Sequence, residues 1–279
     1  MEIIKFVQSF SNPFLDHFFQ LVTMLGEELF FMLILSIIYW CIHKEFGYRL
    51  GLAYLSTVAV NTALKEMFRV PRPIGRPGIR SLRIETADGS SFPSGHSQCT
   101  ATFWTSVMIQ FRKKWIYVVG AILTLAVGFS RIYLGVHWLT DVIGGIIIGV
   151  LWVFISNKIF DHAQKTGNPA IFLSILIPAI LGMVFIHTAN YYKVSGTAIS
   201  FVVGYLIETR YINFQPKTVF WKQLIKLAAG FGGLFGIRFG LKFLLPPVIF
   251  SDFCRYFLMG IWLTVIAPWL FKMLFANKK

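Results

Sequence analysis

The chain has 279 residues, of which 56% are hydrophobic, and it carries a formal net charge of +14. A soluble domain is usually about 45–50% apolar, so this composition excludes an ordinary soluble protein. Apolar runs such as residues 30–40 do not alternate with polar side chains, which excludes a transmembrane β-barrel. Three single cysteines, Cys41, Cys99 and Cys254, form neither a Cys-x-x-Cys pair nor an even framework, so we interpret them as small core hydrophobes.

The elements along the chain predict an all-α fold, a polytopic membrane helical bundle. Residues 13–26 form an amphipathic stretch rich in Phe and Leu, which indicates a helix lying at the membrane interface. A bilayer core takes about 20 apolar residues per helix, and about nine such runs follow: 28–42, 46–66, 97–111, 115–134, 138–157, 170–188, 194–207, 224–245 and 255–275.

Half of the 26 Lys and Arg residues lie in alternate short loops, as expected for the cytoplasmic side of a membrane. This distribution favours a membrane protein over a partner of nucleic acid. The loop after the second span breaks the pattern with six cations: Lys65, Arg69, Arg72, Arg76, Arg80 and Arg83. By alternation this loop faces outward, and its charge marks a functional region. Arg76, Arg80 and Arg83 fit a second anionic group in a substrate and a solvated loop equally well.

Three polar motifs stand at the outer ends of predicted spans. The first is Lys65-x6-Arg72-Pro73, in which a lysine point charge and an arginine fork can bind different oxygens of one phosphate. Pro71 and Pro73 stiffen the backbone on both sides of Arg72. Taken alone, this motif is a weak signal for phosphate binding.

The second motif, Pro93-Ser94-Gly95-His96, begins a predicted helix. Free backbone N–H groups and the positive end of the helix dipole favour an anion there. Ser94 adds a hydroxyl donor, Gly95 lets the backbone approach closely, and His96 can donate a proton. The motif therefore predicts one wall of an anion site.

The third motif runs from Ser130-Arg131 to His137 and Asp141. His137 and Asp141 are four residues apart, so on a helix the carboxylate can accept a proton from one imidazole nitrogen. The other nitrogen is then free to act as a nucleophile or a base. Arg131 supplies a fork that grips phosphate. A polar loop between two membrane helices is the plainer reading, but three such motifs at the same ends of neighbouring helices favour a site.

In this order the motifs resemble the signature of the type 2 phosphatidic acid phosphatase (PAP2) superfamily, in its membrane-bound lipid phosphatase branch. The resemblance covers residues 65–141. It implies that His137 attacks phosphorus to form a phosphohistidine, that Asp141 orients His137, and that His96 protonates the leaving group. It also implies which residues hold the phosphate oxygens without a metal ion or other cofactor: Lys65, Arg72, Ser94, Gly95 and Arg131.

The resemblance predicts a PAP2-like catalytic core over residues 1–160. The apolar runs beyond it, which the resemblance does not cover, predict an additional C-terminal transmembrane bundle over residues 161–279. We expect a phosphatase of a lipid phosphate or diphosphate, in the plasma membrane with its site facing the extracytoplasmic side. A lipid phosphotransferase with the same intermediate is the closest alternative. A transporter or flippase, suggested by the C-terminal helices with Arg238 and Lys242, does not explain the pairing of His137 with Asp141. The sequence leaves the lipid and the oligomeric state open.

Overall fold

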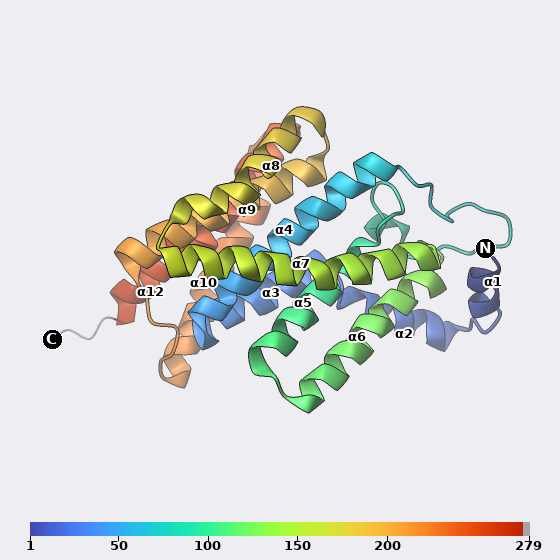
Figure 1. The fold of residues 1–279 in the computed structure, drawn as a ribbon, viewed down its shortest axis with the longest axis horizontal. Helices are drawn as coiled ribbons and strands as arrows, with labels where there is room; N and C mark the ends of the chain where they lie inside the picture. The colour runs from blue at the N-terminus through green and yellow to red at the C-terminus, as the bar shows by residue number, and fades with distance from the viewer. Residues whose placement is uncertain (276–279) are drawn as a thin grey trace. The chain divides into compact units, whose positions relative to one another are not determined.

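A computed structural model describes residues 1–275 of the protein, and within that range the chain is helical, with no strand (Figure 1). Two compact units are formed. The first comprises Met1–Met32 and Val60–Ile155, and the second comprises Leu33–Ala59 and the chain from Ser156 onward. Residues 33–59 therefore pack with the C-terminal helices, whereas the domain boundary expected after residue 160, a single cut along the chain, stays a prediction.

The helices of the first unit follow one another along the N-terminal half of the chain. They are α1 (Glu2–Gln8), α2 (Pro13–Met24), the start of α3 (Glu28–Ile37), the end of α4 (Lys44–Phe68), the turn η2 (Ile84–Thr86), α5 (Gly95–Phe111), α6 (Lys114–Tyr133) and the first part of α7 (Leu139–Thr166). Within this unit α6 packs against α1, α2 and α5. The helix ends that carry the three motifs therefore belong to one compact unit.

The second unit contains the remaining helices. They are the rest of α3, α4 and α7, together with η1 (Ile38–Ile42), η3 (Pro169–Phe172), α8 (Leu173–Phe185), α9 (Ala189–Ile207), η4 (Glu208–Ile212), α10 (Phe220–Leu244), α11 (Ile249–Ile261), η5 (Trp262–Ile266) and α12 (Ala267–Phe275). Gly196 on α9 lets α11 approach closely. A Cβ at this position would lie only 2.6 Å from the Phe253 carbonyl oxygen.

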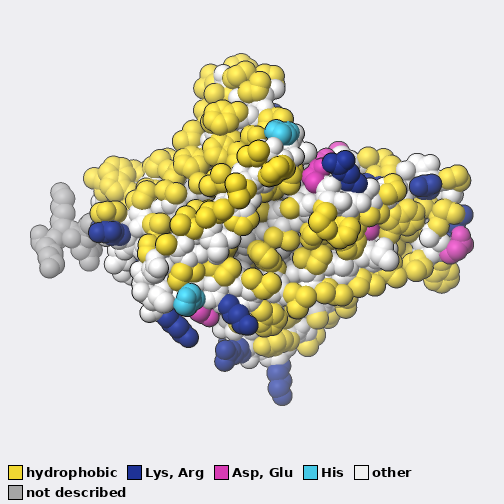
Figure 2. All heavy atoms as spheres, turned by 45° about the horizontal axis from the view of Figure 1, so that its top comes forward, with side chains coloured by type: hydrophobic (Ala, Val, Ile, Leu, Met, Phe, Trp, Pro, Cys, Tyr) yellow, Lys and Arg dark blue, Asp and Glu magenta, His cyan; other side chains and the backbone are white. Residues whose placement is uncertain are grey.

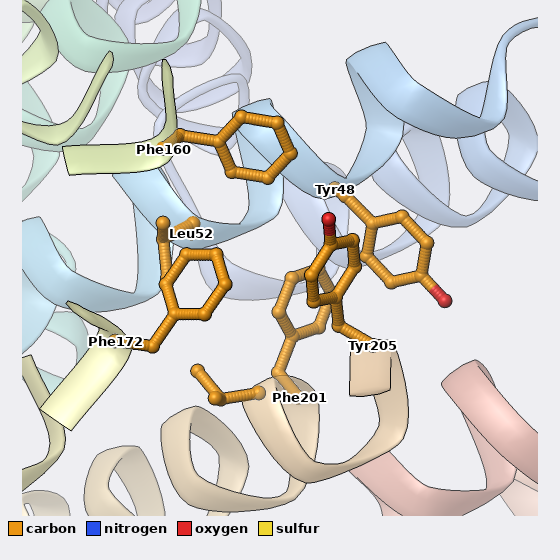
Figure 3. A pocket seen from close by; sticks show the side chains of 7 residues that line it. Tyr48, Leu52, Phe160, Phe172, Phe201 and Tyr205 are labelled. Carbon is orange, nitrogen blue, oxygen red and sulfur yellow. The ribbon is translucent and has the colours of Figure 1, made fainter. Parts of the chain in front are cut away.

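Aromatic side chains fill the middle of the second unit. Figure 3 shows Phe160, Phe172, Phe201 and Tyr205 around a small space, with Leu52 beside Phe172, and the volume of this space is about 10 Å³. A single water molecule needs about that much room. This cavity is therefore a gap in the packing and is too small for a ligand.

Two local signals begin the helices that border the site. The side chain of Asn12 accepts a hydrogen bond from Leu15 N at 3.0 Å, and Pro13 occupies the first position of α2. The side chain of Ser94 accepts a bond from Ser97 N at the start of α5. Ser94 thus acts as a helix cap, whereas the sequence predicted its hydroxyl only as a donor to an anion.

Glycines set the spacing between α5 and α7. A Cβ at Gly145 would lie 2.6 Å from the Ser94 carbonyl oxygen, and a Cβ at Gly149 would lie 2.4 Å from the Gln98 carbonyl oxygen. Only glycine allows the two backbones to come this close. The second and third motifs are thereby held against each other.

Four helical stretches in the described part of the chain are long and apolar enough to cross a membrane: Lys114–Tyr133, Leu139–Thr166, Phe220–Leu244 and Ile249–Phe275. A fifth is possible if Pro13–Met24 and Glu28–Ile42, bent by 48° at their junction, form one broken span or a re-entrant loop. The stretch expected to lie at the interface is thus half of a bent helix pair. Figure 2 shows hydrophobic side chains over much of the visible surface. The nine spans stay a prediction.

Candidate active site

The eight candidate residues lie at helix ends and in loops of the first unit. Lys65 is in the last turn of α4, Ser94 caps α5, Gly95 and His96 begin α5, and Arg131 is in the last turn of α6. His137 lies between α6 and α7, and Asp141 is in the first turn of α7. In Figure 1 the chain passes from the end of α4 through a long loop before it reaches α5. The structure brings all eight together.

His137 and Asp141 are buried and face each other. Nδ1 of His137 lies 3.4 Å from Oδ2 of Asp141, at the long end of the hydrogen-bonding range. The same carboxylate oxygen accepts bonds from Trp138 N at 2.8 Å and from the hydroxyl of Ser91. Because Asp141 accepts the proton on Nδ1, the lone pair of His137 lies on Nε2. Sequence reasoning did not identify Ser91, which fixes the carboxylate from the loop before α5.

Backbone contacts join the second and third motifs. Ser94 N donates to the Asp141 carbonyl oxygen at 3.0 Å, and Ser94 is fully buried. The space beside Gly95 is limited by Asn61, whose Oδ1 would lie 3.3 Å from a Cβ at that position. Asn61 itself donates to Gln98 Oε1 at 2.8 Å and to the Pro93 carbonyl oxygen at 3.2 Å. Asn61, one turn before Lys65, therefore sets the start of α5.

Arg72 uses all five of its N–H groups within the protein. One donates to Nε2 of His137 at 3.0 Å. The others donate to backbone carbonyl oxygens, namely those of Asp88 at 2.7 Å, Gly89 at 2.9 Å, Val136 at 2.9 Å and Ser90 at 3.2 Å. Burial lowers the pKa of Arg72, while Asp141 and Asp88 oppose that effect. Four N–H groups thus shape the loop, and one is available to exchange its partner for a phosphate oxygen.

Arg131 is fully buried and has donors without partners. Its Nη1 donates to Thr23 Oγ1 at 2.8 Å and to Thr86 Oγ1 at 3.3 Å. Over residues 1–275, the structure gives no hydrogen-bond partner to Arg131 Nε, Arg131 Nη2 or His96 Nε2. A buried donor left unpaired costs free energy comparable to that of a lost hydrogen bond. Such donors are therefore expected to be satisfied by an anionic ligand.

The positive charges of three site residues act on the imidazole of His137. Burial lowers the pKa of His137 well below its ordinary value, and the positive charges of Arg131, Arg72 and Lys65 lower it further. Lys65 donates to the Asp88 carbonyl oxygen at 3.0 Å, so it shares that carbonyl with Arg72. A neutral imidazole held among three cations is chemically able to act as a nucleophile, and the cations are able to bind a dianion beside it.

Comparison with known proteins agrees with this geometry. Residues 46–165 match the model of the PAP2 superfamily, and residues 192–279 match that of the PAP2 superfamily phosphatase, transmembrane extension. Phosphatidylglycerophosphatase B of Bacillus subtilis is 30% identical over 167 residues, which make up 55% of this chain and 79% of that protein. The chain belongs to the PAP2 superfamily. The second match, with the apolar helices, makes this PAP2 protein an integral membrane protein.

Two further PAP2 comparisons cover different lengths. A probable sphingosine-1-phosphate phosphatase of Dictyostelium discoideum is 27% identical over 255 residues, 83% of this chain and 62% of that protein. The chain therefore spans less than two thirds of that relative. The crystal structure of Aquifex aeolicus LpxE superimposes with a TM-score of 0.51 and 29% identity over 56% of this chain and 93% of that one. The predicted membership of the PAP2 superfamily is thus confirmed.

The N-terminal segment of this PAP2 chain contributes residues that sequence reasoning missed. Gln8 bonds to the backbone of Arg80 through both ends of its amide, at 2.7 and 3.0 Å, and Asp16 pairs with the guanidinium of Arg80 at 2.6 Å. A Cβ at Gly26 would lie 3.2 Å from Cβ of His96. Helices α1 and α2 therefore hold the loop between α4 and α5, and the turn that follows α2 packs against His96. Asp16 was visible as a polar residue on an amphipathic stretch, but nothing local pointed to its partner.

Proposed function

We propose that this protein is a membrane phosphatase that hydrolyses a lipid phosphate through a phosphohistidine. One observation carries the proposal: buried donors of Arg131 and His96 without partners accompany a neutral His137 imidazole. Donors of this kind suit a tetrahedral anion with three terminal oxygens. The relatives named as lipid phosphate phosphatases support the same reaction.

In the proposed first step, Nε2 of His137 forms a bond to phosphorus while the bond from phosphorus to the lipid oxygen breaks. His96, protonated when the substrate is bound, gives its proton to that oxygen, so the lipid leaves as an alcohol. Burial and the charge of Arg131 lower the pKa of His96, which makes its protonated form a stronger acid. Asp141 holds Nδ1–H and stabilises the positive charge that develops on the imidazole. In the same step, the N–H of Arg72 that bonds to Nε2 of His137 changes its hydrogen-bond acceptor to a phosphate oxygen. The lone pair of Nε2 is then free to attack phosphorus.

In the second step, water attacks the phosphohistidine and the bond between phosphorus and Nε2 breaks. His96 accepts a proton from that water, which restores the starting protonation state. Lys65, Arg131, Ser94 and the Gly95 N–H stabilise the charge on the equatorial oxygens in both transition states. Three cations supply the charge that a metal ion provides in other phosphoryl transfers, so we propose that the reaction is independent of metal.

We further propose that the protein works in the plasma membrane with its site on the extracytoplasmic side. The support is the charge distribution, in which the six-cation loop alternates with loops of the cytoplasmic type. Cysteines introduced at positions 75–90 should react with an impermeant thiol reagent applied from outside, and cysteines at Lys113 and Lys217 should not. The opposite pattern would move the site to the cytoplasm.

Phosphate release by the purified protein in detergent tests the function. Lipid phosphates should release inorganic phosphate, and H137A should reduce the rate to background while its melting temperature is unchanged. His187 is exposed and lies in the second unit, so H187A is the matched control and should keep full activity. Label transfer to another lipid or sugar without phosphate release would instead favour the phosphotransferase. Lipid movement without phosphorus chemistry would favour a flippase.

A further inference from the structure

The six-cation loop between α4 and α5 carries less unpaired positive charge than its composition suggests. Arg80 pairs with Asp16 of α2 through both guanidinium nitrogens at 2.6 Å, and Arg83 pairs with Glu27 at 2.6 Å. Both acids belong to the bent N-terminal helix pair or to its junction. Two of the three arginines that could meet a second anionic group are therefore already neutralised.

Arg83 lies beside the phosphate donors. The Thr86 hydroxyl accepts from Arg131 Nη1 at 3.3 Å and donates to the Arg83 carbonyl oxygen at 2.9 Å. The charge of Arg83 acts on Arg131 and on His96, and the charge of Glu27 opposes it at Arg131. Glu27 thus pairs with a loop arginine whose backbone carbonyl accepts a bond from Thr86, the same hydroxyl that accepts from Arg131.

The donors that remain suit one phosphoryl group. They are Nε and Nη2 of Arg131, Nε2 of His96, the N–H that Arg72 gives to His137 and the ammonium of Lys65, which makes one bond to a backbone carbonyl. Nε of Arg83 also has no hydrogen-bond partner in the described part of the chain, but it belongs to a guanidinium whose charge Glu27 neutralises. One terminal phosphoryl group brings about two negative charges and three oxygens. A diphosphate adds a second charged group next to it, which needs another cation. Arg69 and Arg76 are exposed and do not rank among the charges that act most on Arg131 or Lys65.

We propose that the substrate is a lipid monophosphate, and that Glu27 is a specificity residue that keeps Arg83 from neutralising a second phosphate. This inference rests on the proposed function. Arg83 and Glu27 do not touch the reacting atoms. They set the charge next to the phosphoryl group that is attacked. The second phosphate of a lipid diphosphate would lie there without a cation to neutralise it, whereas a lipid monophosphate has no second phosphate.

Farnesyl phosphate and farnesyl diphosphate test the proposal, because they share one tail and differ by one phosphate. Initial rates of phosphate release by the whole protein in detergent should give a kcat/KM at least about tenfold higher for the monophosphate, as expected for one unmatched charge near a partly buried site. Equal or faster release from the diphosphate would overturn the monophosphate preference and leave the phosphatase intact. Release from neither compound would instead count against the proposed function.

Variants of the ion pair identify its part in the preference. E27Q should remove the closer of the two carboxylates beside Arg83, leaving Glu85 at 4.0 Å from its Nε. It should lower the KM for farnesyl diphosphate by about fivefold to tenfold, with a smaller change for farnesyl phosphate. The double variant E27Q/R83Q should return the ratio of the two kcat/KM values to that of the parent. R69Q removes one exposed cation from the same loop and should leave the ratio unchanged. If the lower KM for farnesyl diphosphate in E27Q persists in E27Q/R83Q, the ion pair does not set the preference. If E27Q is unstable, the comparison of the two farnesyl compounds in the parent protein still tests the monophosphate preference.

Discussion

Arg72 donates a hydrogen bond across 3.0 Å to Nε2 of His137, so the nitrogen proposed to attack phosphorus has its lone pair engaged by a guanidinium. The other four N–H groups of Arg72 hold backbone carbonyl oxygens of the surrounding loops. One side chain therefore orders the loop and covers the nucleophile. A phosphate oxygen that takes over this N–H both binds to the site and uncovers His137.

Lysine at position 72 should fail in both tasks, because three donors on a flexible stem cannot replace a fork with five. We expect R72K to lower kcat/KM by at least about 100-fold and to lower the melting temperature, since buried carbonyls lose their donors. Arg69 is exposed in the same loop and donates to one backbone carbonyl, so R69K is the control and should match the parent in both measurements. Full activity of R72K would show that the five-donor arrangement is dispensable.

His96 is expected to be the proton donor to the leaving group. A donor matters most when the leaving group is poor, so H96A should slow an alkyl phosphate about 10²–10⁴-fold more than p-nitrophenyl phosphate. H137A should slow both substrates alike, because every substrate needs the nucleophile. Rates of both variants on both substrates check this. Equal losses in H96A would mean that His96 binds phosphate and that the acid lies elsewhere.

The low pKa of His137 predicts how activity depends on pH. The neutral imidazole is the nucleophile, so activity is present above the pKa in the folded protein and is lost as the pH falls through it. Because that pKa lies well below 6.5, the acidic limb of kcat/KM that belongs to His137 should lie below pH 6.5. Lys65 is one of the cations responsible, so K65Q should move this limb to higher pH. The ionisation of the substrate is the same in both profiles and cancels in their difference. An unmoved limb would mean that Lys65 does not act on His137.

Thr23 is expected to position Arg131. T23V removes the acceptor at 2.8 Å from Arg131 Nη1 and should weaken inhibition by inorganic phosphate about tenfold, the equivalent of roughly 1–2 kcal/mol. T23S keeps the hydroxyl and should restore the inhibition constant of the parent. Thr124 is buried on α6, seven residues before Arg131, so T124V controls for the loss of a buried hydroxyl. If T124V weakens phosphate as much as T23V does, the effect is one of packing.

Metal independence gives a separate test of the three cations. Activity should persist in excess EDTA, and vanadate should inhibit at low concentration, because its five-coordinate form resembles the in-line transition state. R131Q should lose much of the sensitivity to vanadate while keeping its fold in detergent. A strict requirement for Mg²⁺ would show that Lys65, Arg72 and Arg131 do not supply the charge alone.

The parts of the site that could be predicted depend on local signals. His137 and Asp141 are four residues apart, and Ser94 caps a helix three residues before its bonded N–H, so short spacings were enough to bring these groups together. The contact of Thr23 with Arg131 spans 108 residues, and that of Gln8 with Arg80 spans 72. No periodicity in the sequence encodes such pairings, because they depend on how α1 and α2 pack against α6.

Long-range packing also explains why residues 13–26, expected to lie on the membrane surface, instead make contacts within the protein. The amphipathic pattern of residues 13–26 fits a helix on a membrane surface, but a polar face can equally meet polar partners within the protein, as Thr23 does with buried Arg131 and Asp16 does with exposed Arg80. For Arg80 and Arg83 the sequence fits two interpretations equally well, a contact with the substrate and a position in a solvated loop. They form ion pairs with Asp16 and Glu27, a third possibility that composition alone does not suggest.

The packing of residues 33–59 with the C-terminal helices has a consequence for biosynthesis. Trp40 donates to the Leu263 carbonyl oxygen at 2.9 Å, and Tyr39 donates to that of Thr264 at 3.3 Å, across 223 and 225 residues of chain. A ribosome adds about 5–20 residues per second, so these two buried side chains wait roughly 10 to 45 seconds for their partners to be made. Until then Tyr39 and Trp40 lack the carbonyl acceptors that η5 supplies. We therefore expect the nascent chain to depend on a chaperone or the insertion machinery until η5 has been made.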